Sequence, residues 1–163
     1  MSIKTLNDLF IHALSDVYNA EKQLTKALAK LARAADQEDL VNAFKTHLDE
    51  TLGQIERLDK LVESTPDVRI KRIKCLAMEG LVKEGQEMID GIDAGPVRDA
   101  GLIAAAQKVE HYEIATYGTL CALAEKLDYT LARQLLGQTL DEEKNADKKL
   151  TLIAEKKINK HIA

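Results

Sequence analysis

The sequence has few of the residues that interrupt helices or favour sheets. Its 163 residues include two prolines, eight glycines, two phenylalanines, four tyrosines and no tryptophan. Ala, Leu, Lys and Glu are abundant instead, and this usage is typical of long helices. A chain of this length fits one domain that buries about 70% of its unfolded surface. The composition therefore predicts a single all-α domain over residues 1–163.

Further absences narrow the class of protein. Cys75 and Cys121 are too few and too far apart for a disulfide framework or a zinc knuckle. No apolar run approaches the roughly 20 residues that span a bilayer, and the N-terminus lacks a charged-then-apolar signal segment. We therefore expect no membrane association and a cytoplasmic location. The net charge of −4 argues against nucleic acid as the main partner, although residues 69–74 form one basic run.

A pattern in the first half of the chain recurs 92 residues later without a gap. The matching positions are Glu21 and Glu113, Leu28 and Leu120, Leu31-Ala32 and Leu123-Ala124, Asp36 and Asp128, Leu48-Asp49-Glu50 and Leu140-Asp141-Glu142, and Leu58 and Leu150. Each copy contains two helical periods and a short turn, which predicts two antiparallel helical hairpins at about 4–64 and 96–160. Residues 65–95 have no counterpart and carry one more helical period, which predicts a crossover containing a fifth helix.

The expected helices cover residues 4–35, 37–64, 70–90, 97–127 and 129–160. Pro66 prevents the second helix from continuing, and Pro96 is pre-organised for the first turn of the fourth. The long crossover lets the second hairpin start from the opposite end of the bundle, as in ferritin-like folds. The prediction is an all-α, ferritin-like four-helix bundle.

Acidic residues occupy positions that the helical period assigns to the core. In the first helix the apolar series runs through Phe10, Leu14, Val17, Leu24, Leu28 and Leu31, and Glu21 fills its remaining position. The other helices place His47, Glu50, Glu110, Glu113, Glu142, Glu143 and Asp147 on their inward faces. In the last helix the repeat selects Glu142 and the apolar period selects Glu143, so both are candidates. No Lys or Arg occurs on these faces at the level of the acids, so a buried salt-bridge network lacks its cations.

Buried carboxylates must pair, take up protons or bind a cation, because an isolated buried charge is costly. The set predicts two ions of iron or manganese, bridged by glutamates and held by the remaining acids and His47. The usual Glu-x-x-His motif is missing, because Gly53 and Asn145 stand three residues after Glu50 and Glu142. The alternative is a metal-free bundle in which tyrosine, threonine or water donates hydrogen bonds to the acids.

Five sequence strings carry a resemblance to a known family. They are Ala20-Glu-Lys-Gln-Leu24, His47-Leu-Asp-Glu-Thr51, Ala77-Met-Glu-Gly80, Gln107-Lys-Val-Glu-His-Tyr-Glu113 and Thr139-Leu-Asp-Glu-Glu-Lys144. Together they resemble the bacterial YciE/YciF stress-response proteins over nearly the whole chain. The resemblance implies a cytosolic homodimer of ferritin-like bundles, similar in fold to rubrerythrin and other di-iron carboxylate proteins. It implies no established reaction.

Three classes of function follow from these patterns. The first is a di-metal protein that handles iron, oxygen or peroxide in the bacterial stress response, with the acids as ligands. The second is a stress-induced interaction or structural protein whose acidic core holds no metal. The third, a ferritin-like protector of nucleic acid, is disfavoured by the acidic charge balance. No residue is assigned as catalytic, and the enzymatic reaction stays open.

Overall fold

The computed structural model describes residues 3–158 and 160 and contains five α-helices in that part of the chain. They are α1 (Leu6–Ala34), α2 (Glu38–Ser64), α3 (Leu76–Gly91), α4 (Pro96–Lys126) and α5 (Thr130–Ile153), followed by the short π-helix η1 (Ala154–Ile158). The described residues form no strand, and the all-α prediction is confirmed. None of these helices carries an apolar stretch long enough to cross a bilayer.

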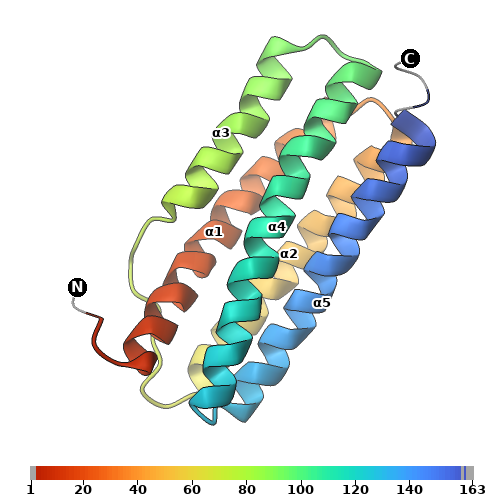
Figure 1. The fold of residues 1–163 in the computed structure, drawn as a ribbon. Helices are drawn as coiled ribbons and strands as arrows, with labels where there is room; N and C mark the ends of the chain where they lie inside the picture. Colours follow the sequence, from red (N-terminus) through yellow and green to blue (C-terminus); the bar gives the residue numbers. More distant parts are fainter. Residues whose placement is uncertain (1–2, 159, 161–163) are drawn as a thin grey trace.

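Helices α1, α2, α4 and α5 form a bundle, and α3 lies outside it (Figure 1). The pairs α1 with α2 and α4 with α5 are antiparallel hairpins, with α2 packed on α5 and α1 on α4. Helix α3 packs against α1 and α4. Because the segment before α3 and α3 itself run back along the bundle, α4 starts at the end where α1 finishes. Two hairpins joined by a long crossover are the arrangement that the repeat predicts.

The third helix begins later than predicted. We expected it from residue 70, but helix α3 starts at Leu76, and residues 68–75 are not helical. Two α1 side chains accept hydrogen bonds from the backbone of this segment: Ser15 Oγ from the Lys71 amide at 2.9 Å, and Asn19 Oδ1 from the Cys75 amide at 2.8 Å. These partners satisfy backbone groups that a helix would otherwise use, so tertiary contacts override the helical period.

Helix ends follow recognisable capping signals. Thr5 and Asp8 form a capping box at the start of α1, and Pro96 is the first residue of α4. The buried carboxylate of Asp99 accepts hydrogen bonds from the Asp36 and Gln37 amides at 2.9 and 2.8 Å. The turn between α1 and α2 is thereby fixed to the first turn of α4, which sets the register between the two hairpins.

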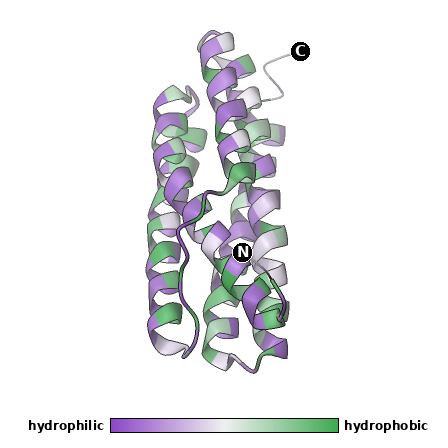
Figure 2. Ribbon diagram, turned by 90° about the vertical axis from the view of Figure 1, so that its left-hand side faces the viewer, coloured by the Kyte–Doolittle hydropathy of each residue, from purple (hydrophilic) through white to green (hydrophobic). Residues whose placement is uncertain are grey.

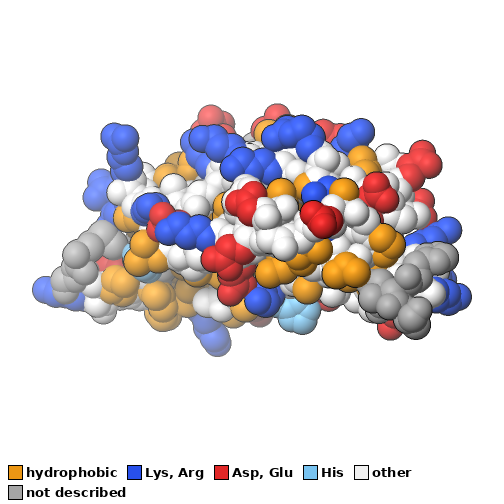
Figure 3. Space-filling model, turned by 90° about the horizontal axis from the view of Figure 1, so that it is seen from above, with side chains coloured by type: hydrophobic (Ala, Val, Ile, Leu, Met, Phe, Trp, Pro, Cys, Tyr) orange, Lys and Arg blue, Asp and Glu red, His pale blue; other side chains and the backbone are white. Residues whose placement is uncertain are grey.

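The bundle core consists of two apolar clusters separated by polar residues. One cluster includes Leu24, Leu28, Phe44, Leu102 and Val109, and the other includes Val17, Leu58, Tyr117, Leu120 and Leu136. Glu21 lies between Val17 and Leu24 on α1, and Glu113 lies between Val109 and Tyr117 on α4. Hydrophilic and hydrophobic residues are mixed along the helices (Figure 2), and the face in Figure 3 carries acidic, basic and apolar side chains together. The break in the apolar core is where the candidate site lies.

Candidate metal centre

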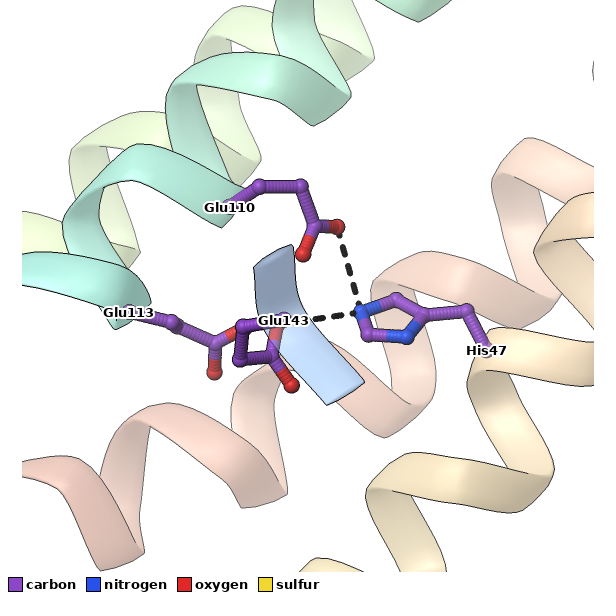
Figure 4. A group of neighbouring side chains, drawn as sticks. All are labelled: His47, Glu110, Glu113 and Glu143. Carbon is purple, nitrogen blue, oxygen red and sulfur yellow. Dashed lines mark ion pairs between the residues drawn. The ribbon is translucent and has the colours of Figure 1, made fainter. Parts of the chain in front are cut away.

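Four buried side chains from three helices point toward one another at this level (Figure 4). His47 comes from α2, Glu110 and Glu113 come from α4, and Glu143 comes from α5. Each offers one ligand atom, and these atoms all lie within 4.8 Å of one another. Ligand atoms on opposite sides of a single cation, at roughly 2.0–2.6 Å from it, are about 4–5 Å apart. The spacing therefore fits one ion.

His47 is oriented by a carboxylate outside this group. Its Nδ1 lies 3.1 Å from Glu50 Oε2, and its Nε2 lies 3.1 Å from Glu110 Oε1 and 3.6 Å from Glu143 Oε2. Although Nε2 is close to both oxygens, it makes no well-directed hydrogen bond. A histidine that binds metal through one nitrogen usually gives the other to a carboxylate or carbonyl, which fixes the ring. Glu50 and His47 have this arrangement.

Several buried oxygens of the acids have no hydrogen-bond partner in the described part of the chain. They are both carboxylate oxygens of Glu113 and the Oε2 atoms of Glu21, Glu110 and Glu143. Leaving buried acceptors unsatisfied costs about 1–3 kcal/mol each, and more for charged groups. A cation at the centre of the group would bind one oxygen each of Glu110, Glu113 and Glu143, so the donor set fits a metal ion.

The electrostatics of the group show the same need for positive charge. Burial, reinforced by the neighbouring charges of Glu143 and Glu21, raises the pKa of Glu113 well above its ordinary value. Burial and Glu110 likewise raise the pKa of Glu143. Burial alone would lower the pKa of His47, but Glu110, Glu50 and Glu143 outweigh it and raise that pKa. Without metal, protons on the glutamates and the protonated imidazole of His47 therefore supply the positive charge of the group.

Glu21 lies beside the four-residue group but not in it. Its side chain is fully buried, and Tyr117 Oη donates a short hydrogen bond to its Oε1. Burial raises the pKa of Glu21 to about 7, although the Tyr117 hydrogen bond acts in the opposite direction. The expectation that a tyrosine hydroxyl satisfies a buried acid is met here.

Glu142 and Glu143 have different surroundings. Glu143 is buried in the group, whereas Glu142 points to Arg57, which forms an ion pair with it and also donates to Thr139 Oγ1 at 2.9 Å. Buried Gln54 donates through Nε2 to Glu142 Oε2 at 3.0 Å and to Glu143 Oε1. The prediction that no cation is available at this level was wrong. Arg57 lies at the edge of the inward face of α2, and its long side chain reaches across to α5.

Two other candidates also lie outside the group. Glu50 contacts it only through His47, and its side chain is 37% exposed. Asp147 faces away, with Oδ2 at 3.3 Å from His111 Nε2 and Oδ1 accepting from Gln107 Nε2 at 3.2 Å. The contact of Gln54 with Glu142 and Glu143 was not predicted from the sequence, because amides give no charge signal.

A pocket connects the group with the surface between α2 and α5. Its volume is about 240 Å³, and its inner end is formed by His47 and Glu110. Apolar walls come from Ala43, Phe44, Ala146 and Leu150, and the remaining lining residues are Thr46, Glu50, Asn145 and Lys149. The side of the candidate centre on which His47 lies is therefore accessible to small molecules.

Comparison with known proteins identifies the family. Residues 5–163 match the family model described as a domain of unknown function, DUF892. The chain belongs to the DUF892 family. It is 61% identical over 160 residues to Protein YciF of Escherichia coli strain K12, covering 98% of this chain and 96% of that protein. The resemblance stated from the five sequence strings is confirmed.

Solved structures of similar proteins share the fold. The crystal structure of the E. coli stress protein YciF matches with a TM-score of 0.94 and 61% identity, over 97% of this chain and 99% of that one. YcfI from Rhodopseudomonas palustris matches with a TM-score of 0.87 and 44% identity, over 92% and 95%. A protein from Xanthomonas campestris, at 20% identity and a TM-score of 0.74 over 93% and 92%, shows the same fold only.

Proposed function

We propose that this protein is a ferritin-like stress-response protein whose His47, Glu110, Glu113 and Glu143 bind one ion of iron or manganese for the handling of an oxidant. The observation that carries the proposal is the group itself: four buried ligand atoms within 4.8 Å of one another, several of them without a protein partner. The link to stress comes from the relative, which is described as a stress protein.

The choice of metal follows from the ligand types. Carboxylates suit manganese and other hard cations, whereas imidazole suits iron, copper, nickel and zinc. Three carboxylates and one imidazole nitrogen therefore favour Mn(II) or Fe(II). No thiol lies in the group, which argues against a site selected for copper(I).

The structure supports one ion better than the two expected from the repeat. A second ion would need Glu21 together with Glu50 and Glu142, but Glu50 bonds to His47 and Glu142 bonds to Arg57. Glu21 alone adds one carboxylate beside Glu113, already bonded to Tyr117. The proposed stoichiometry is therefore one metal ion per chain.

The protein residues have separable roles in this centre. Glu50 orients His47, while Glu113 and Glu143 supply negative charge from the apolar interior. A bound redox-active ion would supply one-electron chemistry toward a small oxidant. Apolar clusters on both sides keep bulk water out, so access is limited to the pocket between α2 and α5.

Metal analysis and thermal melting test the proposal. Protein purified without chelator should contain close to one equivalent of iron or manganese, and excess Mn(II) should raise the melting temperature of chelator-treated protein. At a hundredfold excess over Kd the stabilisation is about 2.7 kcal/mol, or roughly 5–10 °C for a domain of this size. Asp147→Asn, outside the group, should keep the shift. Absence of both copurified metal and any shift would refute the proposal.

A metal-free interaction or structural protein is the second candidate. Arg57 and Gln54 already satisfy Glu142 and part of Glu143, as expected where a polar network replaces a metal. The relative YcfI is described as a candidate structural protein. A metal-free protein of this kind should show no change in melting temperature when Mn(II) is added.

We also propose that two chains associate as a homodimer. In support, Leu76 at the start of α3, the helix that lies outside the bundle, is 72% exposed. Exposed apolar side chains of this size are common at interfaces between copies. Light scattering should report twice the chain mass of 18.1 kDa at micromolar concentration, and a monomer would contradict the assembly.

A further inference from the structure

The pocket described above lies on one side of the contact between α2 and α5. The 92-residue repeat relates its lining to a second set of positions on the same two helices. Ala146 and Lys149 correspond to Gln54 and Arg57, and His47 and Glu50 correspond to Thr139 and Glu142. The two sets can therefore be compared position by position.

Side chains fill the corresponding place on the other side. Gln54 is fully buried there, and Arg57 reaches across α5 to bond Thr139 and the carboxylate of Glu142. At the pocket, the small Ala146 replaces Gln54, so the space stays open. Glu50 bonds to His47 and not to Lys149. The pocket therefore contains Lys149 in the place of Arg57, but the corresponding carboxylate, that of Glu50, is paired with His47 instead.

The lining defines the kind of molecule that fits. A volume of about 240 Å³ equals the space of about eight water molecules at roughly 30 Å³ each, which exceeds the size of dioxygen or peroxide. Phe44 and Leu150 give apolar walls. Lys149 forms no ion pair in the described part of the chain. At the inner end, Glu50 and Glu110 repel anions, so an anionic group would face outward to Lys149.

We propose that this pocket binds a small organic carboxylate, with its carboxylate group at Lys149 and its apolar body between Phe44 and Leu150 beside His47. The carboxylate of the bound acid pairs with Lys149 in the same way as the carboxylate of Glu142 pairs with Arg57 on the other side. The apolar end then lies next to the metal centre, and this part of the proposal rests on the proposed function.

Hexanoate is a suitable probe, with hexylamine as its cationic counterpart. Isothermal titration calorimetry on chelator-treated protein should detect hexanoate binding and little hexylamine binding. Lys149→Glu should weaken hexanoate binding at least roughly fivefold and favour hexylamine, since the rim charge is reversed. Lys148→Glu makes the same charge change at an exposed neighbour outside the pocket lining, and should leave both affinities unchanged.

The repeat itself provides the second variant. The double substitution Ala146→Gln and Lys149→Arg introduces the residues of the filled side, and should abolish hexanoate binding while helicity by circular dichroism stays the same. Hexanoate affinity that is unaffected by both this variant and Lys149→Glu, or no binding to the original protein, would overturn the pocket assignment.

A relaxation experiment separates this proposal from the metal proposal. With Mn(II) bound, the methyl protons of hexanoate should relax faster than the protons next to its carboxylate, because the apolar end is nearer the ion. Equal broadening along the chain, or stronger broadening beside the carboxylate, would overturn the orientation. If the protein binds hexanoate but takes up no metal, the proposal of a carboxylate-binding pocket is supported and only the proposed function is refuted.

Discussion

The two hairpins have the same fold but contribute unequally to the buried polar centre. Glu21 of α1 and Glu113 of α4 correspond in the repeat, and both are fully buried. At the other positions the counterparts of Glu110, Glu143 and His47 are Tyr18, Thr51 and Thr139. Three of the four candidate ligands therefore come from the second hairpin. A fold with repeated halves therefore need not produce a symmetric set of candidate ligands.

The charge balance differs between the halves as well. Glu142 has Arg57 as a partner inside the protein, whereas among the described residues Glu113 forms no ion pair and both of its oxygens lack hydrogen bonds. The protein thus neutralises one acid itself and leaves the other to protons or metal. Substitutions of these residues test whether the difference affects metal affinity and the free energy of unfolding.

The largest expected effect comes from removing a ligand of the second hairpin. Glu143→Gln removes the carboxylate that α5 contributes to the group, at the position where α2 has Thr51, and keeps the size of the side chain. Loss of one of four ligands should lower metal affinity by roughly a hundredfold or more, since even indirect partners of ligands contribute about 10–100-fold. Competition with a fluorescent chelator measures it. Metal affinity equal to that of the original protein would exclude Glu143 as a ligand.

Stability without metal should change in opposite directions at Glu113 and Glu142. Glu113→Gln removes a buried charge that has no cation in contact, and should stabilise chelator-treated protein by about 1–3 kcal/mol at pH 8. Glu142→Gln removes the partner of the partly exposed Arg57, and should destabilise it by about 1 kcal/mol. Urea unfolding of both variants measures the two effects. Destabilisation by Glu113→Gln would show that this acid has a partner in the metal-free state.

The pH dependence should reveal the same unpaired acids. Because the pKa of Glu21 is raised from 4.5 to about 7, and those of Glu113 and Glu143 are also raised, the folded state binds more protons than the unfolded state above pH 4.5. Stability of metal-free protein should therefore fall as pH rises from about 5 to 8. The raised pKa of His47 acts in the same direction, since its stabilisation is lost as pH rises through that folded-state pKa.

Urea unfolding at several pH values, with chelator present, measures this trend. Excess Mn(II) should reduce or reverse the slope, because the ligands must lose protons to bind metal. Metal-free stability that stays level or increases over this range would contradict the raised pKa values.

The smallest predicted effect compares two tyrosines. Tyr117 donates to the buried Glu21, whereas Tyr18 donates to the exposed Asp59 at 2.9 Å. Tyr117→Phe should cost about 1–2 kcal/mol in urea unfolding, because it leaves one more buried oxygen unsatisfied. Tyr18→Phe should cost less than about 0.5 kcal/mol, since water replaces the lost partner. Equal effects would show that Glu21 finds another donor.

Local sequence patterns determined the helices and the buried level of the acids. The 3.6-residue period and the prolines located four helices within a few residues, and the apolar series of the first helix identified Glu21 as a core position. These features depend on neighbours along one helix. The repeat and the length of the crossover likewise determined which helices pair, because a short turn requires antiparallel neighbours.

Only the tertiary structure decided which acids meet. Glu142 and Glu143 are adjacent in sequence, and their separation into an Arg57 partner and a buried ligand depends on how α5 is rotated against α2. The extended segment before α3 depends on Ser15 and Asn19, more than 50 positions away. Helical periodicity gives the face of a residue within about one position, but contacts between side chains require the distance and rotation of the opposite helix, and these are set by packing across the whole bundle.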